Sequence, residues 1–132
     1  MTGAAPDGLA RWHAYIKAPD HSALWAMLHA DVVFESPVVH SPQRGRDITF
    51  KYLASADKVL GGPGFTYVGE WTAPGSAILE FENVVRGIKV NGIDMIWWDD
   101  DGLIIRFKVM VRPLKAMNLV HVMMGEMLVA AG

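Results

Sequence analysis

The feature that most constrains this chain is a block of strand-like segments that follows a block of helix-like segments. The strand-like segments cover residues 65–72, 77–86, 89–98 and 103–112, and they are rich in β-branched and aromatic residues. Short turns with Gly, Pro or Asp join them. Four such strands predict an antiparallel meander. Helices placed before a meander predict an α+β fold in which one sheet face meets helices.

Three helices are expected before the meander and one after it. Apolar residues recur at helical spacing in residues 8–18 and again after Asp20, which is a suitable N-cap. A third helix is predicted over residues 47–60, and a short strand over residues 32–35 precedes it. A last, mostly apolar helix is predicted over residues 114–130.

The bulk composition limits the class of protein. A length of 132 residues with 52% apolar residues and no cysteine predicts one domain, residues 1–132, without disulfides. A formal net charge of −2 without long runs of one sign argues against a nucleic-acid partner. No leader-like segment opens the chain, and polar side chains interrupt its most apolar stretch, so we expect a cytoplasmic protein that does not enter a membrane.

No metal or cofactor is expected. The Asp-rich turn at residues 99–102 lacks the alternating ligands of a calcium loop and is explained by a tight hairpin. No pair of histidines has the spacing of a metal site with a carboxylate.

Period-two alternation assigns Asp94 to the inner face of the sheet, together with apolar residues of the neighbouring strands. Burial disfavours the charged form of a carboxyl group, so we expect the pKa of Asp94 to be raised, as is common at functional sites. The alternative is that Asp94 bonds to a buried amide or water and only holds its strand in place.

The same alternation places charged residues on the outer face. Glu80 and Glu82 are expected there, able to pair with Arg106, Lys108 or Arg112 across strands or across a dimer. Met95, Trp97 and Met110 lie among these charges. The outer face is therefore either a solvated surface or the interface of a homodimer.

Residues 29–38, with Pro42 and Gly45 before a helix, resemble the first-strand segment of bacterial ketosteroid isomerases. Residues 92–94, followed by an Asp-rich turn with Gly102, extend the likeness. In the order of its elements the chain resembles the nuclear-transport-factor-like superfamily, which includes ketosteroid isomerases, SnoaL-like polyketide cyclases and dehydratases. The resemblance implies a conical fold with three N-terminal helices packed on a curved, mixed but mostly antiparallel sheet, plus a C-terminal helix. It also implies a pocket for a small hydrophobic molecule and dimerisation through the outer sheet face.

The resemblance also implies roles for single residues. Asp94 corresponds to a protonated aspartic acid that donates to a substrate oxyanion in the isomerases. Ser36 stands where they keep their general base, and a serine hydroxyl does not take a proton from carbon near neutral pH. Trp12 corresponds to their oxyanion-hole tyrosine, and Tyr15, one turn on, is a possible substitute. His40, in the loop after Ser36, is a further candidate base.

The predicted catalytic residues are therefore Asp94, His40 and Tyr15. Aromatic and inward-facing apolar residues are equally compatible with a filled core or with a ligand cavity. Those predicted to bind the ligand are Trp12, Phe34, Ser36, Phe50, Leu53, Phe81, Ile96, Trp98, Phe107 and Val109.

Three functions remain open on the sequence. The first is an isomerase, cyclase or dehydratase that moves protons on a carbonyl or hydroxyl compound without the usual isomerase base. The second is a binding protein with the same pocket and no catalysis. The third is a dimeric interaction module whose cavity is filled by its own side chains.

Overall fold

Four helices and one six-stranded sheet make up the computed structural model, which describes residues 7–130. The elements are α1 (Gly8–Lys17), α2 (His21–Met27), β1 (Leu28–Glu35), β2 (Gln43–Arg44), α3 (Arg46–Leu60), β3 (Thr66–Ala73), β4 (Ser76–Val85), β5 (Ile88–Trp98), β6 (Ile104–Arg112) and α4 (Leu114–Ala130). The predicted domain limits at residues 1 and 132 lie outside the described residues.

The sheet is mixed and mostly antiparallel, as predicted. Its strand order is β2-β1-β6-β5-β4-β3, in which β3 to β6 form the expected antiparallel meander. The first strand returns to pair with β6 in parallel, and the two-residue strand β2 adds an edge that the sequence pattern did not predict. Pairing of Leu28 with Ile104 extends β1 four residues further toward its N-terminus than predicted.

The first two helices begin at aspartates whose side chains accept backbone hydrogen bonds. Asp7 accepts from the amides of Leu9 and Ala10, and Asp20 accepts from the amide of Ser22 at 3.0 Å. Free amides at a helix N-terminus need such partners. Each of these two helices therefore begins directly after its capping aspartate.

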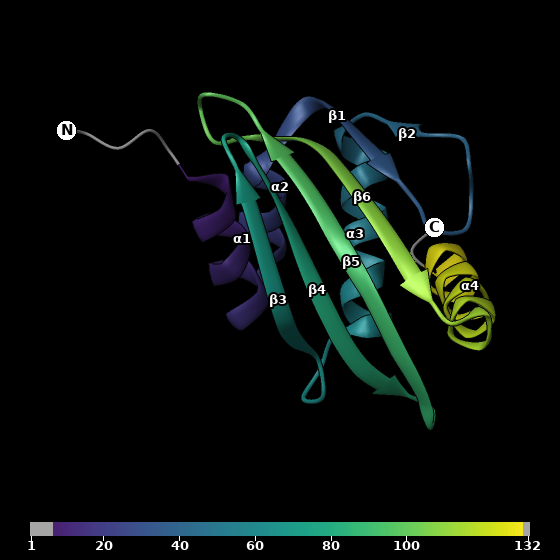
Figure 1. Ribbon diagram of the computed structural model, residues 1–132. Helices are drawn as coiled ribbons and strands as arrows, with labels where there is room; N and C mark the ends of the chain where they lie inside the picture. Colours follow the sequence, from purple (N-terminus) through teal and green to yellow (C-terminus); the bar gives the residue numbers. More distant parts are fainter. Residues whose placement is uncertain (1–6, 131–132) are drawn as a thin grey trace.

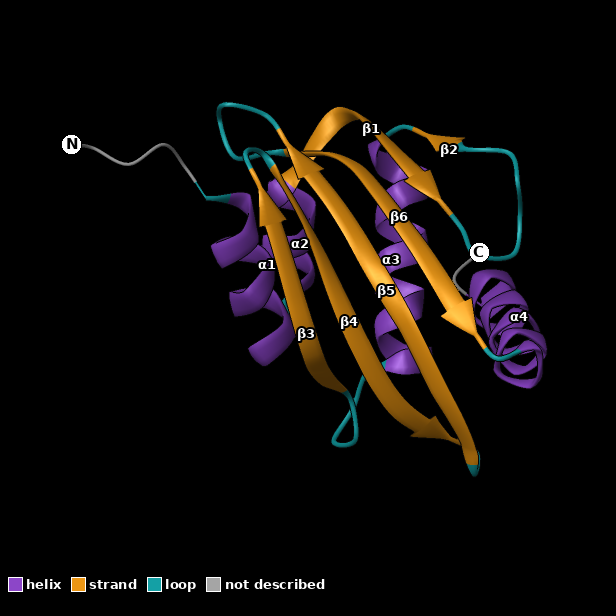
Figure 2. Ribbon diagram, viewed as in Figure 1, coloured by secondary structure: helices purple, strands orange, loops and turns teal. Residues whose placement is uncertain are grey.

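Helices α1, α2 and α3 cover one face of the curved sheet, whereas α4 lies beside β6 and packs against α3 (Figures 1 and 2). The main core fills the space between these layers. Its largest fully buried side chains include Phe81, Phe107, Leu24, Leu79 and Ile96. Burial of such side chains contributes roughly 1.5–3 kcal/mol each. The fold is α+β, as the sequence pattern predicted, and has the conical form that the resemblance implied.

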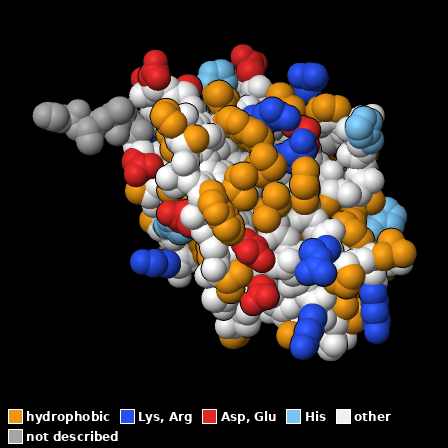
Figure 3. All heavy atoms as spheres, in the orientation of Figure 1, with side chains coloured by type: hydrophobic (Ala, Val, Ile, Leu, Met, Phe, Trp, Pro, Cys, Tyr) orange, Lys and Arg blue, Asp and Glu red, His pale blue; other side chains and the backbone are white. Residues whose placement is uncertain are grey.

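The opposite sheet face carries hydrophobic side chains among charged ones (Figure 3). Here the predicted pairing of the glutamates of β4 with the cations of β6 across neighbouring strands is wrong, because β5 lies between these two strands, whereas their pairing across a dimer stays a prediction. Arg106 and Lys108 instead pair with Glu35 of the adjacent strand β1, at 2.5 and 3.7 Å. Glu80 accepts a hydrogen bond from Asn91.

Among the described residues, none of the helices combines the length and the apolar character that crossing a membrane requires.

Candidate functional site

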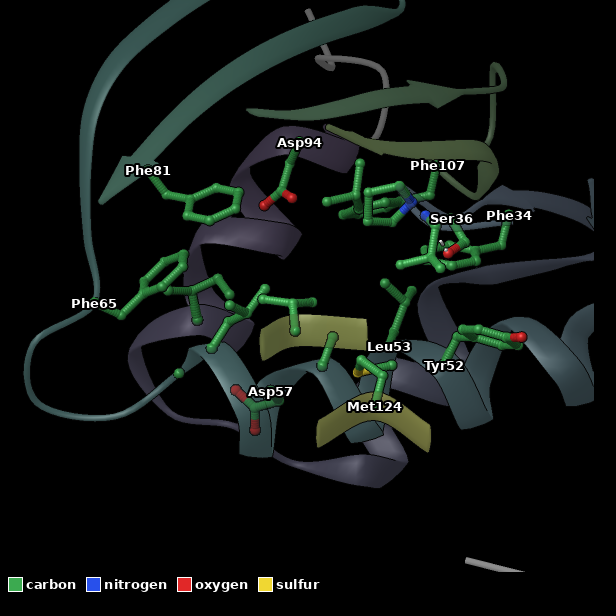
Figure 4. A pocket seen from close by; sticks show the side chains of 18 of the residues that line it. Phe34, Ser36, Tyr52, Leu53, Asp57, Phe65, Phe81, Asp94, Phe107 and Met124 are labelled. Carbon is green, nitrogen blue, oxygen red and sulfur yellow. Dashed lines mark hydrogen bonds between the residues drawn. The ribbon is translucent and has the colours of Figure 1, made fainter. Parts of the chain in front are cut away.

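A cavity of about 440 Å³ lies between the inner face of the sheet and helices α1, α3 and α4. A volume of this size suits a small organic ligand. Figure 4 shows the aromatic rings of Phe65, Phe81 and Phe107 around the space, with Asp94 between the last two. The core side chains therefore leave this space unfilled, and its use as a ligand pocket stays a prediction.

Asp94 brings a carboxyl group into this apolar cavity from the middle of β5. Its strand neighbours are Leu79 on β4 and Val109 on β6, and only 7% of Asp94 is exposed. The hydroxyl of Tyr67, on β3, donates a hydrogen bond to Oδ2 of Asp94 at 2.5 Å. A charge-assisted hydrogen bond of this length is among the stronger kinds in proteins.

A second hydrogen bond fixes the tyrosine. The indole Nε1–H of Trp12, on α1, donates to the hydroxyl of Tyr67 at 2.9 Å. Because a phenol has only one proton to donate, accepting from Trp12 leaves that proton for Asp94. Helix α1, strand β3 and strand β5 thus converge in one chain of hydrogen bonds that ends at the carboxyl group of Asp94.

The electrostatics of this chain follow from burial. Desolvation raises the pKa of Asp94 to about 7, although the hydrogen bond from Tyr67 acts in the opposite direction. Burial and the neighbouring charge of Asp94 also raise the pKa of Tyr67, which stays protonated. Near neutral pH, Asp94 therefore exists in both protonation states and suits acid or base chemistry.

Gly92 leaves space for the ring of Phe81, which lies between Tyr67 and β5. Phe81 pairs with Tyr67 on one side and with Gly92 on the other. A Cβ atom at position 92 would come within 2.5 Å of Cζ of Phe81. A glycine at this point therefore lets Phe81 lie flat over the sheet beside Asp94.

Ser36 lies where β1 ends, and it lines the same cavity. Its Oγ accepts a hydrogen bond from the amide of Val38 at 3.1 Å, which stabilises the turn that contains Pro37. A hydroxyl held in this way does not supply a general base.

The structure brings most of the predicted site residues to the cavity. Those among its lining residues are Asp94, Tyr15, Trp12, Phe34, Ser36, Leu53, Phe81, Phe107 and Val109. Their roles in catalysis or binding stay predictions.

Four predicted residues do not line the cavity. His40 is exposed in the loop after β1. Phe50 is on another face of α3, where its ring packs edge-on against Trp25 at 5.6 Å. Ile96 is fully buried in the core further along β5, and Trp98 packs beside Gly8. The rotation of α3 thus places Phe50 elsewhere, and the positions of Ile96 and Trp98 further along β5 place these two side chains elsewhere.

The sequence analysis did not select two polar residues of the site, Asp57, which lines the cavity, and Tyr67, which lies behind its wall and bonds to Asp94. Alternation along β3 with Phe65 could have identified Tyr67 as inward-facing. Asp57 belongs to α3, and no local pattern distinguished it from a solvated helix residue. Burial raises its pKa.

The last helix also contributes to the cavity wall, through Val120, His121, Met124, Gly125 and Leu128. His121 is exposed and is also one of the residues that line the cavity. Among residues 7–130, no group of three His, Asp or Glu side chains is arranged to hold a metal ion.

Solved structures closely resemble this fold. A steroid delta-isomerase from Pseudomonas aeruginosa is 36% identical, with a TM-score of 0.87 and coverage of 94% of this chain and 90% of that chain. An uncharacterized protein with a cystatin-like fold from Silicibacter pomeroyi is 28% identical, with a TM-score of 0.82 and coverage of 95% and 86%.

A more distant likeness supports the fold alone. A protein with a ketosteroid isomerase-like fold from Catenulispora acidiphila, solved in complex with trimethylamine, is 15% identical, with a TM-score of 0.57 and coverage of 80% of this chain and 85% of that one. No protein-family model and no curated protein sequence matches the chain.

Proposed function

This chain belongs to the nuclear-transport-factor-like superfamily, and on that premise we propose that its cavity binds a small, largely apolar molecule and acts on an oxygen atom of that molecule through Asp94. The observation that carries the proposal is the hydrogen bond from Tyr67 to Asp94 inside an apolar cavity. A buried carboxyl group with a dedicated donor, and with no ion pair among residues 7–130, favours a functional over a purely structural role.

The geometry supports Asp94 as a hydrogen-bond donor or acid. Since Tyr67 donates to Oδ2, the proton of a neutral Asp94 belongs on Oδ1. That proton is then directed at a carbonyl oxygen or a departing hydroxyl group of the ligand. The apolar walls exclude water, so such a bond stabilises a developing negative charge more strongly than it would in solvent.

The reaction class is an isomerisation or elimination by proton transfer. The likeness to a steroid delta-isomerase supports an isomerase-type reaction on a carbonyl compound. In such a reaction a base takes a proton from the carbon next to the carbonyl, the enolate oxygen accepts a hydrogen bond from Asp94, and the protonated base returns a proton at another carbon. Because Ser36 is held in a turn and His40 does not line the cavity, water or a buffer base that enters the cavity carries this proton. Of the two predicted assisting groups, Tyr15 lines the cavity, whereas His40 does not. We therefore retain Tyr15 as a residue of the cavity wall, while its hydroxyl oxygen is buried away from the open space.

Deuterium exchange tests this proposal without knowledge of the natural substrate. A bicyclic β,γ-unsaturated ketone is incubated with the protein in D₂O, and incorporation next to the carbonyl is followed by NMR. We expect incorporation above the buffer rate, its loss in Asp94→Asn, and its retention in Asp100→Asn, which changes an exposed aspartate of the next turn. Equal exchange by the Asp94→Asn protein contradicts the assignment.

A second candidate function is ligand binding without turnover. Ser36 favours it, because its hydroxyl stabilises a turn and stands where related isomerases keep their base. This candidate predicts that the same ketone binds without accelerated exchange. Recovery of isomerised or deuterated ketone contradicts it.

We also propose that the outer sheet face forms a homodimer. Trp71, Val84 and Met110 on this face are each about half exposed, and Figure 3 shows hydrophobic side chains gathered over the strands. Exposed apolar groups of this kind favour an interface. Light scattering should give twice the monomer mass for the native chain and one monomer mass for Met110→Glu. A native monomer contradicts the proposal.

A further inference from the structure

The outer side of β5 is an uncharged strip in the middle of the outer sheet face. Its outward side chains from residue 91 to residue 97 are Asn91, Ile93, Met95 and Trp97, and all four are partly exposed. The residues between them are buried on the inner face, Asp94 among them. Apolar side chains that stay open to solvent in the middle of a sheet face are typical of an interface (Figure 3).

The strand on one side of this strip, β6, is positively charged. Its charged residues are Arg106, Lys108 and Arg112, and register pairing with β5 places all three on the outer face. Glu35 pairs with the first two, whereas Arg112 forms no ion pair among residues 7–130. One carboxylate against three cations leaves this side of the face positive.

The strand on the other side, β4, is negatively charged. Glu80 and Glu82 are its charged residues, and they pair in register with Ile93 and Asn91 of β5. Within the part of the chain that the structure describes, neither glutamate forms an ion pair, although Glu80 accepts a hydrogen bond from Asn91. Glu82 is the more exposed of the two and lies nearer the end of the strand, at the rim of the face.

We propose that a second copy of this chain covers the outer face, with the two-fold axis of the dimer along β5. Rotation about such an axis turns the sheet over and exchanges its two sides, so β6 of each copy faces β4 of the other. The positive strand then meets the negative strand twice. An axis across the strands would place β6 on β6 and β4 on β4, where like charges repel. The homodimer of the proposed function thereby receives its geometry, and this inference rests on that homodimer.

Register pairing gives the residues that meet across this axis. Glu80 and Met110 are both partners of Ile93, on opposite sides of it. With Ile93 on the axis, Met110 of one copy lies over Glu80 of the other. The next outward residues of β6, Lys108 and Arg112, then flank that glutamate, and their long side chains can reach it.

The apolar middle of the face suits the same axis. Ile93 and Met95 of each copy meet their own counterparts, so the uncharged strip forms the core of the interface and the charged strands form its margins. These two residues flank Asp94, whose side chain enters the cavity from the other face of the strand. The two cavities therefore lie back to back, and the contact supports the strand that carries the carboxyl group.

Cross-linking of single cysteines tests the axis, because the chain has no cysteine of its own. Packed sheets lie about 10 Å apart, within reach of a short bis-maleimide reagent. We expect Ile93→Cys to link to itself. Glu80→Cys and Met110→Cys should link to each other in an equilibrated mixture, and each should link to itself far more slowly. A dimer that cross-links in any other pattern overturns the inference.

Light scattering first checks that each cysteine variant is a dimer. Where Ile93→Cys weakens the dimer, Met95→Cys, the next outward residue of the strip, takes its place. Self-linking of either variant supports an axis along β5.

Opposite charges at position 110 give an independent test. Met110→Glu puts a carboxylate over Glu80 of the other copy, whereas Met110→Lys puts an ammonium group there. In a dilution series, we expect Met110→Glu to raise the dissociation constant at least about tenfold and Met110→Lys to keep it within about threefold of the native value. Glu80→Lys added to Met110→Glu should restore the dimer. If Met110→Lys dissociates as readily as Met110→Glu, the axis does not lie along β5.

The outcomes separate the axis from the homodimer itself. A native protein that stays monomeric at every concentration overturns the homodimer and this inference together. A native dimer in which neither Ile93→Cys nor Met95→Cys links to itself leaves the homodimer standing and overturns only its axis.

Discussion

The hydroxyl of Tyr67 lies 2.5 Å from Oδ2 of Asp94, and these two residues come from strands separated in the sheet by β4. The contact is possible because the intervening ring, Phe81, lies over Gly92 and leaves the space beside it open. The hydrogen bond orients Asp94 and limits how far burial raises the pKa of its carboxyl group. Tyr67 is thus a positioning residue for the candidate site.

Tyr67→Phe should raise the pKa of Asp94 above its native value of about 7, because the hydrogen bond that opposes the effect of burial is lost. The change also leaves the buried Nε1–H of Trp12 without an acceptor. An unpaired buried donor costs about 1–3 kcal/mol of unfolding free energy. NMR titration of ¹³C-labelled aspartate carboxyl groups measures the first effect, and denaturant unfolding measures the second.

A second substitution distinguishes these two effects. Trp12→Phe in the Tyr67→Phe background removes the unpaired donor as well, so part of the lost stability should return. The pKa of Asp94 should stay raised, because the phenol is still absent. A titration midpoint equal to that of the native protein in both variants contradicts the role of Tyr67.

Asp94→Asn should make the protein more stable at pH 8 and leave its stability nearly unchanged at pH 4. Between the ordinary pKa of 3.8 and the folded value of about 7, the unfolded chain has lost the proton of Asp94 and the folded chain retains it. The folded state then binds more protons, so the contribution of Asp94 to stability falls as the pH rises through this window. The asparagine variant cannot ionise, so its unfolding free energy does not fall in this window. The fall in the native protein amounts to about 4 kcal/mol at most.

The measurement is a comparison of unfolding free energies at several pH values. Other carboxyl groups titrate alike in both proteins, so the difference between them isolates Asp94. A constant difference from pH 4 to pH 8 contradicts a raised pKa. A gain in stability together with a loss of deuterium exchange, in contrast, is the pattern expected of a functional carboxyl group.

Glu35→Gln should lower stability slightly at pH 7. The hydrogen bond and charge of Arg106 hold the pKa of Glu35 below its ordinary value, so this contribution is present above the unfolded pKa of 4.5 and is lost as the pH falls through the folded value. The pair is partly exposed, and solvent screening limits its worth to under about 1 kcal/mol. Denaturant unfolding at pH 7 and pH 3 measures the change.

Glu82→Gln is the matched control for this prediction, because Glu82 is an exposed acid of β4 and forms none of the ion pairs among the described residues. Its unfolding free energy should equal that of the native protein. If Glu82→Gln lowers the unfolding free energy as much as Glu35→Gln, then the ion pairs of Arg106 and Lys108 with Glu35 make no specific contribution to stability.

The sequence predicted what depends on local periodicity. Alternation placed Phe81, Asp94 and Phe107 on the inner face correctly, because each strand of the meander pairs with its neighbour in sequence. Local patterns cannot show that β1 returns to pair with β6, and for that reason Glu35 was not recognised as the partner of Arg106. Non-local pairing of this kind is fixed only by the whole fold.

The candidate site, like the fold, could be predicted only in part from the sequence. Asp94 is conspicuous in the sequence because a carboxyl group on an apolar face is rare. Its partner Tyr67 was missed because the contact spans two strand pairings and depends on the small size of Gly92. Asp57 was missed because the rotation of α3 about its axis decides whether a side chain reaches the cavity.

Gly125 provides a test of whether α4 controls the cavity. This glycine lies in the interior of α4 and lines the cavity, and a Cβ atom added to it would meet no atom within 4 Å. Gly125→Ala should therefore stabilise the protein by about 0.5–1 kcal/mol, since glycine is a poor helix former and no clash opposes the change. The unfolding free energy in denaturant measures this gain.

Gly125→Leu should separate stability from binding. Leucine favours a helix nearly as well as alanine, so the folded state should be at least as stable as the native one. Its longer side chain extends into the space that the ligand needs, and the affinity for 2-naphthol should fall at least about tenfold, whereas Gly125→Ala should change it little. Equal affinity in the native and Gly125→Leu proteins would place the ligand away from α4 and would contradict this helix as a wall of the binding site.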